Sequence, residues 1–205
     1  MKFRKVHFLS GLIISVFIGM HLINHGSAVL GEEKHIEVMN SFRKIYRNVF
    51  LETILISAVV VQIFSGLSLF RSRKNQVRSF FENLPYWSGL YLAFFLLIHL
   101  SAVFFGRLVL DLDTNFYFGA AGLNTFPYNL FFIPYYSLAI VSFFGHISAI
   151  HFRKMNGNLL FMSPKNQAVA ILIFGFIVTF FLIFNLTNGF QGVEIPDEYG
   201  VLTGN

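Results

Sequence analysis

The chain has 205 residues, of which 55% are hydrophobic and only 12% are charged, with a net charge of +5. This composition is that of an integral membrane protein. The basic residues are dispersed over predicted connections and no separate domain carries them, so the positive charge does not indicate nucleic-acid binding. The absence of cysteine excludes disulfides, c-type haem attachment and iron–sulfur clusters held by this chain.

Five apolar runs are long enough to cross about 30 Å of hydrocarbon as helices. The sequence therefore predicts an all-α fold, a single five-helix transmembrane domain over residues 1–186, and an exposed C-terminal tail over residues 187–205. The start of the chain resembles that of a signal peptide, but the first run is too long and too polar for one, so we expect a retained helix. The predicted helices span residues 6–30, 48–70, 86–107, 129–152 and 166–185.

The distribution of basic residues predicts the orientation. Lys and Arg concentrate on the cytoplasmic side of membrane proteins, and most of the 15 in this chain fall on the side that holds the N-terminus. We therefore expect a cytoplasmic N-terminus and an outside C-terminus, in a membrane of the bacterial inner or mitochondrial inner type. The basic residues on this side are Lys2, Arg4, Lys5, Arg71, Arg73, Lys74, Arg78, Arg153, Lys154 and Lys165.

The first run carries His7, His21 and His25. At about 100° per residue, these histidines lie within one face of a helix. An ionisable side chain inside hydrocarbon costs about 2.5–3.5 kcal/mol unless it faces the protein interior and finds a partner, so this face is a functional-site hypothesis. For His7, as for His35 and His151, the preferred interpretation is a hydrogen bond to a neighbouring helix.

Two polar connections lie on the predicted outer side. Residues 31–47 carry apolar side chains at three-residue steps between Ile36 and Ile45. A short interfacial helix would explain this pattern, but we expect a solvated connector. Residues 108–128 could fold over the outer mouth of the bundle.

Depth in the membrane groups side chains from different runs. At 1.5 Å per residue, His21 and His99 lie about 13 and 12 Å below the outer ends of their helices. Two imidazoles at one depth can hold a haem iron from both faces, so we predict that this pair ligates a haem b. His146 and Gln62 lie about 9–12 Å from the other end, in a second layer with one histidine. Gln62 either contacts a cofactor in this second layer or forms a hydrogen bond to another helix.

Residues near the outer pair complete the predicted site. His25, one turn from His21, could bond a haem propionate or the second face of the site. Arg43, Arg47 and Arg107 are candidate partners of the propionates, through charge-assisted hydrogen bonds. No predicted helix offers a carboxylate at this depth, which argues against a zinc or di-iron site.

Several short stretches resemble the five-helix cytochrome b membrane anchor of succinate dehydrogenases and fumarate reductases, the class with one anchor polypeptide and two haems. The resemblance rests on the order and spacing of segments rather than on one long motif. The stretches are residues 3–11 and 20–22, Ser88-Gly89 with Ile98-His99, and Tyr135-Tyr136 with Gly145-His146.

By position, the resemblance implies that His21 and His99 ligate the outer haem and that His146 is one ligand of the inner haem. Gln62 stands where that family has the other inner ligand, so one haem b is expected, or two if the inner site survives. The family also implies electron transfer between cytoplasmic flavoprotein and iron–sulfur subunits and a quinone. In such a complex this chain would be a non-catalytic cytochrome b subunit.

Residues 21–25 and 43–47 also resemble related five-helix membrane proteins, including fungal mitochondrial ones, that are not dehydrogenase subunits. The alternative function is therefore that of a stand-alone membrane protein that binds haem or lipid without redox turnover. A shared fold does not decide between the two functions.

Overall fold

The computed structural model describes residues 2–72, 79–159 and 161–204. In this part of the chain, five helices are long and apolar enough to cross a membrane, so the predicted all-α fold with five helices of membrane-crossing length is confirmed. The helices are α1 (Lys2–Gly26), α2 (Glu32–Tyr46), α3 (Val49–Arg71), α4 (Phe80–Leu108), α5 (Phe116–Asn124), α6 (Asn129–Lys154) and α7 (Pro164–Leu186), with two short 3₁₀ helices, η1 (Ser27–Leu30) and η2 (Asp197–Leu202).

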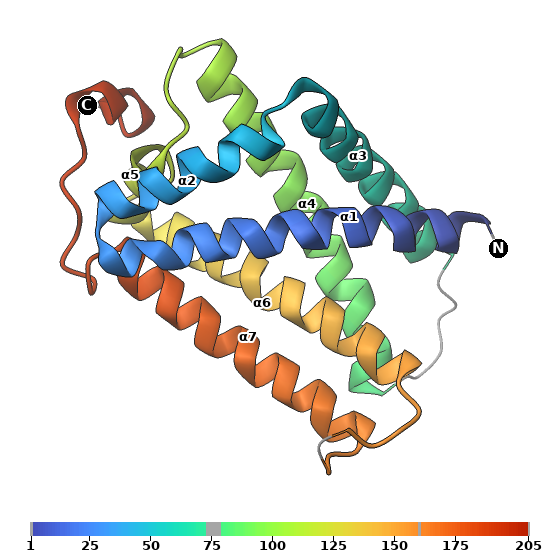
Figure 1. The fold of residues 1–205 in the computed structure, drawn as a ribbon. Helices are drawn as coiled ribbons and strands as arrows, with labels where there is room; N and C mark the ends of the chain where they lie inside the picture. The colour runs from blue at the N-terminus through green and yellow to red at the C-terminus, as the bar shows by residue number, and fades with distance from the viewer. Residues whose placement is uncertain (1, 73–78, 160, 205) are drawn as a thin grey trace.

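The long helices alternate in direction along the bundle (Figure 1). α6 packs against α4 and α7, while α3 packs against α1 and α4. We call the end of the bundle that carries α2, α5 and η2 the α2 end, and the opposite end the N-terminal end. The N-terminus and the connection after α6 lie at the N-terminal end.

Local sequence explains where α4 begins. The predicted start was residue 86, after Pro85, but the helix begins at Phe80. Glu82 accepts a hydrogen bond from the backbone N–H of Ser79 at 2.8 Å, which completes a capping box at the first turn. This cap stabilises the start of the helix, and Pro85 then removes only one backbone hydrogen bond near that start.

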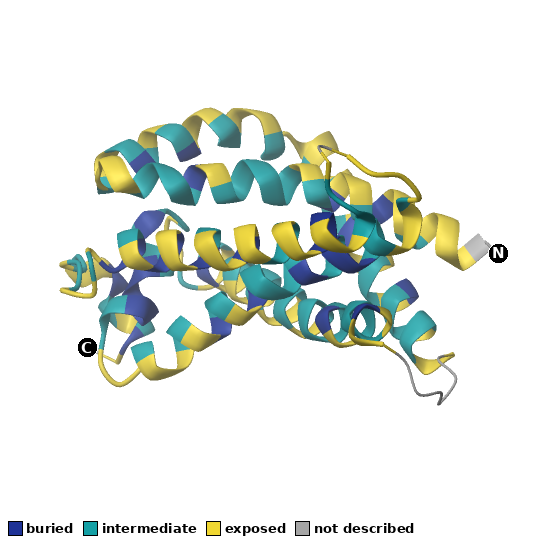
Figure 2. Ribbon diagram, turned by 90° about the horizontal axis from the view of Figure 1, so that it is seen from below, coloured by how far each residue is buried: buried dark blue, intermediate teal, exposed yellow. Residues whose placement is uncertain are grey.

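Small residues allow close packing between α6 and α7. Ala149 and Ala168 are fully buried, and the Ser148 hydroxyl donates to the Ala168 carbonyl at 2.6 Å. A Cβ at Gly175 would lie 2.4 Å from the Cβ of Phe144. The outward surfaces of the long helices, in contrast, are exposed along their length (Figure 2) and largely apolar, as expected for surfaces that contact lipid.

The two connections at the α2 end are helical. Residues 31–47, which we expected to form a solvated connector, instead form α2, so that prediction is wrong. Gly31, with φ of 100°, turns the chain into α2, and one face of the helix directs His35 and Met39 inward. Within residues 108–128, five of the nine residues of α5 are buried, in a cluster with residues of α6 and α7, as expected of a segment that covers this end.

The C-terminal segment also differs from the prediction. Residues 187–205 were expected to form an exposed tail, but Tyr199 is 0% exposed. Its hydroxyl donates to the Asp113 carbonyl at 3.0 Å, and the backbone N–H of Val193 donates to the Asn124 side chain at 3.1 Å. Tyr199 is therefore the main buried aromatic side chain that anchors this segment to the α2 end, together with the contact of Val193.

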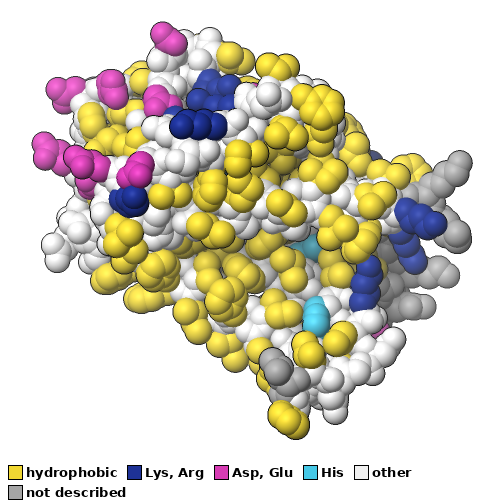
Figure 3. Space-filling model, in the orientation of Figure 1, with side chains coloured by type: hydrophobic (Ala, Val, Ile, Leu, Met, Phe, Trp, Pro, Cys, Tyr) yellow, Lys and Arg dark blue, Asp and Glu magenta, His cyan; other side chains and the backbone are white. Residues whose placement is uncertain are grey.

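Charge is distributed unevenly between the two ends. Acidic side chains gather at the α2 end, and basic ones lie at the N-terminal end and on α2 (Figure 3). At the N-terminal end, Arg153 donates to the Glu82 carbonyl at 3.0 Å and Lys154 lies over the ring of Phe8. Of the basic residues used to predict the orientation, Arg73, Lys74 and Arg78 lie outside the described residues, as does the side chain of Lys2.

We predict that Tyr199→Ala releases the C-terminal segment. Loss of a fully buried ring costs about 3 kcal/mol or more, whereas Tyr199→Phe removes only the hydroxyl bond, worth about 1 kcal/mol. Limited proteolysis of the detergent-purified chain should cleave within residues 187–204 much faster in Tyr199→Ala, slightly faster in Tyr199→Phe, and unchanged in the exposed control Val201→Ala. Equal cleavage of all three variants would contradict the anchoring role.

Candidate cofactor site

The histidines inside the bundle form two layers. The α2-end layer consists of His21, His25, His35 and His99, and the N-terminal layer consists of His7 and His146. At 1.5 Å per residue, His7 and His21 lie about 21 Å apart along α1. The two layers are thus separated by more than half the thickness of the hydrocarbon region, about 30 Å.

In the α2-end layer, His21 of α1 faces His99 of α4. Their ring centres are 6.2 Å apart and the ring planes are inclined by 66°. Phe17 stacks on His21 at 5.6 Å and Phe95 stacks on His99 at 5.1 Å, each from the preceding turn of the same helix. The two imidazoles are therefore held by flanking aromatic rings, at the shared depth that the sequence predicted.

The same separation recurs in the N-terminal layer. The ring centres of His7 and His146 are 6.3 Å apart, with planes inclined by 68°. Two imidazoles bound to opposite sides of one metal ion have ring centres about 6.3 Å apart, given metal–nitrogen bonds of about 2.0 Å and the size of the ring. Both pairs thus have ring-centre separations close to this value.

Neither layer can hold a metal ion with protein groups alone. Among the described residues, no group of three or more His, Asp or Glu side chains has the geometry of a metal site. Each layer supplies one facing pair of imidazoles, fewer protein groups than a metal site built from side chains alone requires. Such a pair is the donor set with which a protein would hold a haem.

His21 also belongs to a row of hydrogen-bonded rings. Its Nε2 lies 3.1 Å from the Nε2 of His25, and the Nδ1 of His25 lies 3.2 Å from the Nε2 of His35. Asn24 contributes its amide nitrogen, 3.2 Å from the same atom of His35. For His21 to bind a metal through Nε2, its ring must therefore rotate so that this nitrogen no longer faces His25.

His35 is the member of this layer that the sequence did not assign to the site. This residue of α2 is 1% exposed, packs against Phe116 and contacts Asn24 of α1. Burial, with a smaller effect from the charge of Arg43, lowers the pKa of His35 to about 4. Two buried atoms here, the Nδ1 of His35 and the Oδ1 of Asn24, have no hydrogen-bond partner in the part of the chain that the structure describes.

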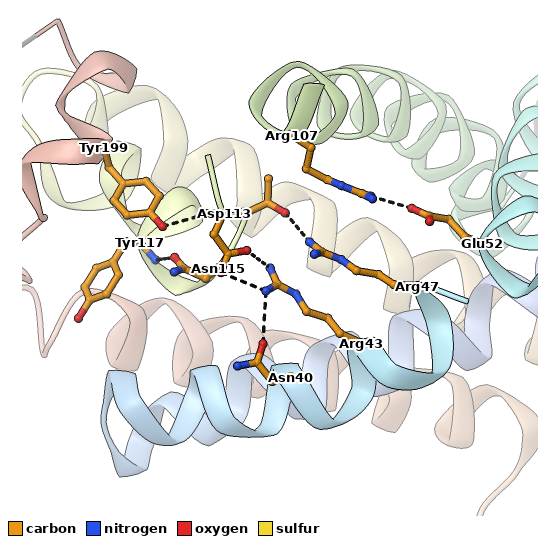
Figure 4. A network of polar contacts seen from close by, with 10 residues as sticks. Asn40, Arg43, Arg47, Glu52, Arg107, Asp113, Asn115, Tyr117 and Tyr199 are labelled. Atoms are coloured by element: carbon orange, nitrogen blue, oxygen red, sulfur yellow. Dashed lines mark hydrogen bonds and ion pairs between the residues drawn. The ribbon is translucent and has the colours of Figure 1, made fainter. Parts of the chain in front are cut away.

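Two of the three arginines proposed as propionate partners are already paired (Figure 4). Arg43 of α2 contacts Asp113 at 2.8 Å, and Arg107 of α4 contacts Glu52 of α3 at 2.7 Å. Both carboxylates are bound closely enough to neutralise their arginines. Arg43 and Arg107 therefore link elements of the α2 end through ion pairs.

Arg47 is placed differently. Its guanidinium donates to the Thr114 hydroxyl at 2.9 Å, and it forms no ion pair with any carboxylate in the described ranges (Figure 4). Burial, together with the positive charges of Arg43 and Arg107, lowers the pKa of Arg47. Of the three arginines, Arg47 is therefore the one without a carboxylate partner among the described residues.

Gln62 bonds to α1 and does not face His146. Its Oε1 accepts from the Ser10 hydroxyl at 2.6 Å, and its Nε2 lies 3.3 Å from the Nε2 of His7. The predicted alternative, a hydrogen bond to another helix, is confirmed. The residue that faces His146 is His7, and the signal for it was its position on the same face of α1 as His21.

The interhelical hydrogen bonds expected for three histidines are all present. His7 contacts Ser65 of α3 at 2.9 Å, His35 contacts Asn24 of α1, and His151 of α6 contacts Gln167 of α7 at 2.7 Å. Only His151 is remote from both layers, so it serves as a reference histidine.

Comparison of the chain with protein-family models, with curated proteins and with solved structures gives no match. The function must therefore be argued from the geometry of the two layers.

We predict that the stability of the α2 end depends on pH through His35. The unfolded state binds this proton below pH 6.5 and the folded state only near pH 4, so stability is complete above about pH 6.5 and falls as the pH is lowered toward 4. Thermal unfolding in detergent at pH 7.5 and pH 5.0 should show a larger loss of Tm in the wild type than in His35→Leu. The same loss in both proteins would contradict this prediction.

Proposed function

We propose that the chain is a haem b protein of the membrane that carries electrons, with His21 and His99 as the axial ligands of one haem. The observation that carries the proposal is the 6.2 Å separation of two imidazoles from different membrane-crossing helices. Because the chain has no cysteine, the haem would be bound without covalent attachment. Haem iron, when bound, supplies one-electron redox chemistry.

The surrounding residues would hold and tune the ligands. Phe17 and Phe95 restrict the rotation of the two imidazoles by stacking on them. His25 would remain beside His21 as a hydrogen-bonding neighbour, and such neighbours set the orientation and basicity of a ligand. Arg47 is the best placed of the arginines to pair with an anionic group such as a propionate, since Arg43 and Arg107 already have carboxylate partners.

We also propose the orientation and the partners implied by the sequence. The N-terminal end would face the cytoplasm and contact flavoprotein and iron–sulfur subunits, in keeping with its basic residues. A quinone would bind at the α2 end, near His25 and Asn24. The buried Nδ1 of His35 and Oδ1 of Asn24, which have no partner among the described residues, offer a donor and an acceptor suited to a quinone head group.

A second candidate function is that of a stand-alone haem- or lipid-binding protein without redox turnover. One observation favours it: an apolar groove of about 460 Å³ between α3 and α4. The groove runs from Val59 to Val109 and ends beside the Arg107–Glu52 pair, where a polar head group could lie next to an apolar chain. Copurification of flavoprotein and iron–sulfur subunits would favour the first function over this one.

The proposal predicts a b-type reduced-minus-oxidised spectrum for the detergent-purified chain. His21→Ala and His99→Ala should each remove one haem per polypeptide, because loss of an axial ligand leaves the iron held from one face only. His151→Ala, which alters a histidine remote from both layers, should retain the full haem content. Size-exclusion chromatography checks that each variant is folded, and a wild type with no haem spectrum would contradict the proposal.

A further inference from the structure

The N-terminal layer contains a second ligand pair, and the inference drawn from it rests on the proposed haem function. We infer that His7 and His146 are the axial ligands of a second haem b, in which Gln62 is a neighbour and not a ligand. The two imidazoles come from α1 and α6, and their ring centres are separated by 6.3 Å.

Ser65 fixes the tautomer of His7. The Ser65 hydroxyl donates its hydrogen to the Val61 carbonyl at 2.6 Å, so its oxygen must accept at the 2.9 Å contact with the Nδ1 of His7. His7 therefore carries its proton on Nδ1 and presents a lone pair on Nε2. This is the form in which histidine binds a metal through Nε2.

Ser88 fixes the tautomer of His146 in the same way. Its hydroxyl donates to the Leu84 carbonyl at 2.6 Å, which leaves its oxygen to accept from the Nδ1 of His146 at 3.2 Å. Within the described ranges, the side-chain hydrogen bond of His146 goes through its Nδ1. Two serines on two different helices, α3 and α4, thus prepare the two imidazoles in the same tautomer, each with a lone pair on Nε2.

The contact of Gln62 agrees with this assignment. Its Oε1 accepts from Ser10, so its amide N–H groups remain as donors, and one of them lies 3.3 Å from the Nε2 of His7. The contact is long for an N–H···N hydrogen bond and is readily exchanged for a metal–nitrogen bond. A donating amide nitrogen is compatible with a lone pair on the Nε2 of His7 and cannot itself ligate iron.

Glycines provide the space beside each ring. A Cβ at Gly66 would lie 3.3 Å from the Cε1 of His7, and a Cβ at Gly89 would lie 3.2 Å from the Cε1 of His146. These contacts are tighter than ordinary van der Waals contacts, so the absence of side chains here lets both rings pack directly against a helix backbone. The rings are thereby held at fixed depth, in helices that cross the membrane.

A second haem would extend the electron path along the bundle. The N-terminal layer lies about 21 Å from the α2-end layer along α1, so a haem in each would bring redox groups near both ends of the membrane-crossing helices. The proposed cytoplasmic partners and the proposed quinone site would then be connected through this chain alone.

The test measures haem per polypeptide and the low-spin haem signals by electron paramagnetic resonance, in the full-length chain purified in detergent. We expect two haems in the wild type, one in His7→Ala and His146→Ala, and one in His21→Ala and His99→Ala. The double variant with His21→Ala and His146→Ala should contain none. Gln62→Ala is the matched control in the N-terminal layer and should retain two haems.

A chemical rescue separates ligation from folding. His146→Gly leaves a space the size of an imidazole, so added free imidazole should restore the lost low-spin signal if His146 is a ligand. Failure of this rescue in a variant that elutes as the wild type does would overturn the inference.

The outcomes distinguish the inference from the proposed function. A single haem that is lost only in His21→Ala and His99→Ala would overturn the inference and leave the proposed function standing. Haem that is lost only in His7→Ala and His146→Ala would support the inference and remove the proposed α2-end site. A wild type without haem would overturn both, and loss of a haem in Gln62→Ala equal to that in His7→Ala would assign the ligand to Gln62 and overturn the inference.

Discussion

The cost of placing polar side chains in hydrocarbon governs this structure. Each histidine, glutamine or serine in a membrane-crossing helix must face the protein and meet a partner, because lipid offers none. The chain satisfies this requirement by bringing polar groups of different helices together at two depths, with the apolar cluster of Ile14, Ala58 and Val59 among the residues between them. The polar groups thus determine which faces of the helices pack against each other, while the apolar residues on the outside are interchangeable contacts with lipid.

The two layers are built on different chemical principles. In the N-terminal layer each imidazole donates to a serine that itself donates to a backbone carbonyl, so the direction of both imidazole–serine bonds is fixed. In the α2-end layer three imidazoles bond to one another in a row, and the amide nitrogen of Asn24, which can only donate, makes the Nε2 of His35 the acceptor at the end of that row. The first layer therefore takes its proton positions from serine hydroxyls, and the second takes them from a side-chain amide.

The sequence predicted the parts of the fold that follow from membrane thickness. A run of apolar residues must be long enough to cross the membrane, which identifies the long helices. The depth of each residue then follows from the helical rise, and this calculation correctly placed His21 and His99 at the same level. His7 was interpreted as hydrogen-bonded to a neighbouring helix and was not paired with His146; α1 begins at Lys2, so His7 lies within the helix, and its ring faces that of His146. The anchoring of the C-terminal segment could not be predicted, since it depends on the burial of one tyrosine in a segment without periodicity.

The uneven distribution of charge has a consequence for encounters with other molecules. Acidic side chains at the α2 end, where basic residues of α2 also lie, and basic side chains at the N-terminal end make the bundle an electric dipole along its axis, with its two ends in separate aqueous compartments once it lies in a membrane. Soluble molecules that approach the two ends are therefore selected by opposite signs of surface charge, over a range set by the Debye length of about 8 Å at physiological ionic strength. Added salt would slow the arrival of a charged partner at either end without altering the buried histidine layers.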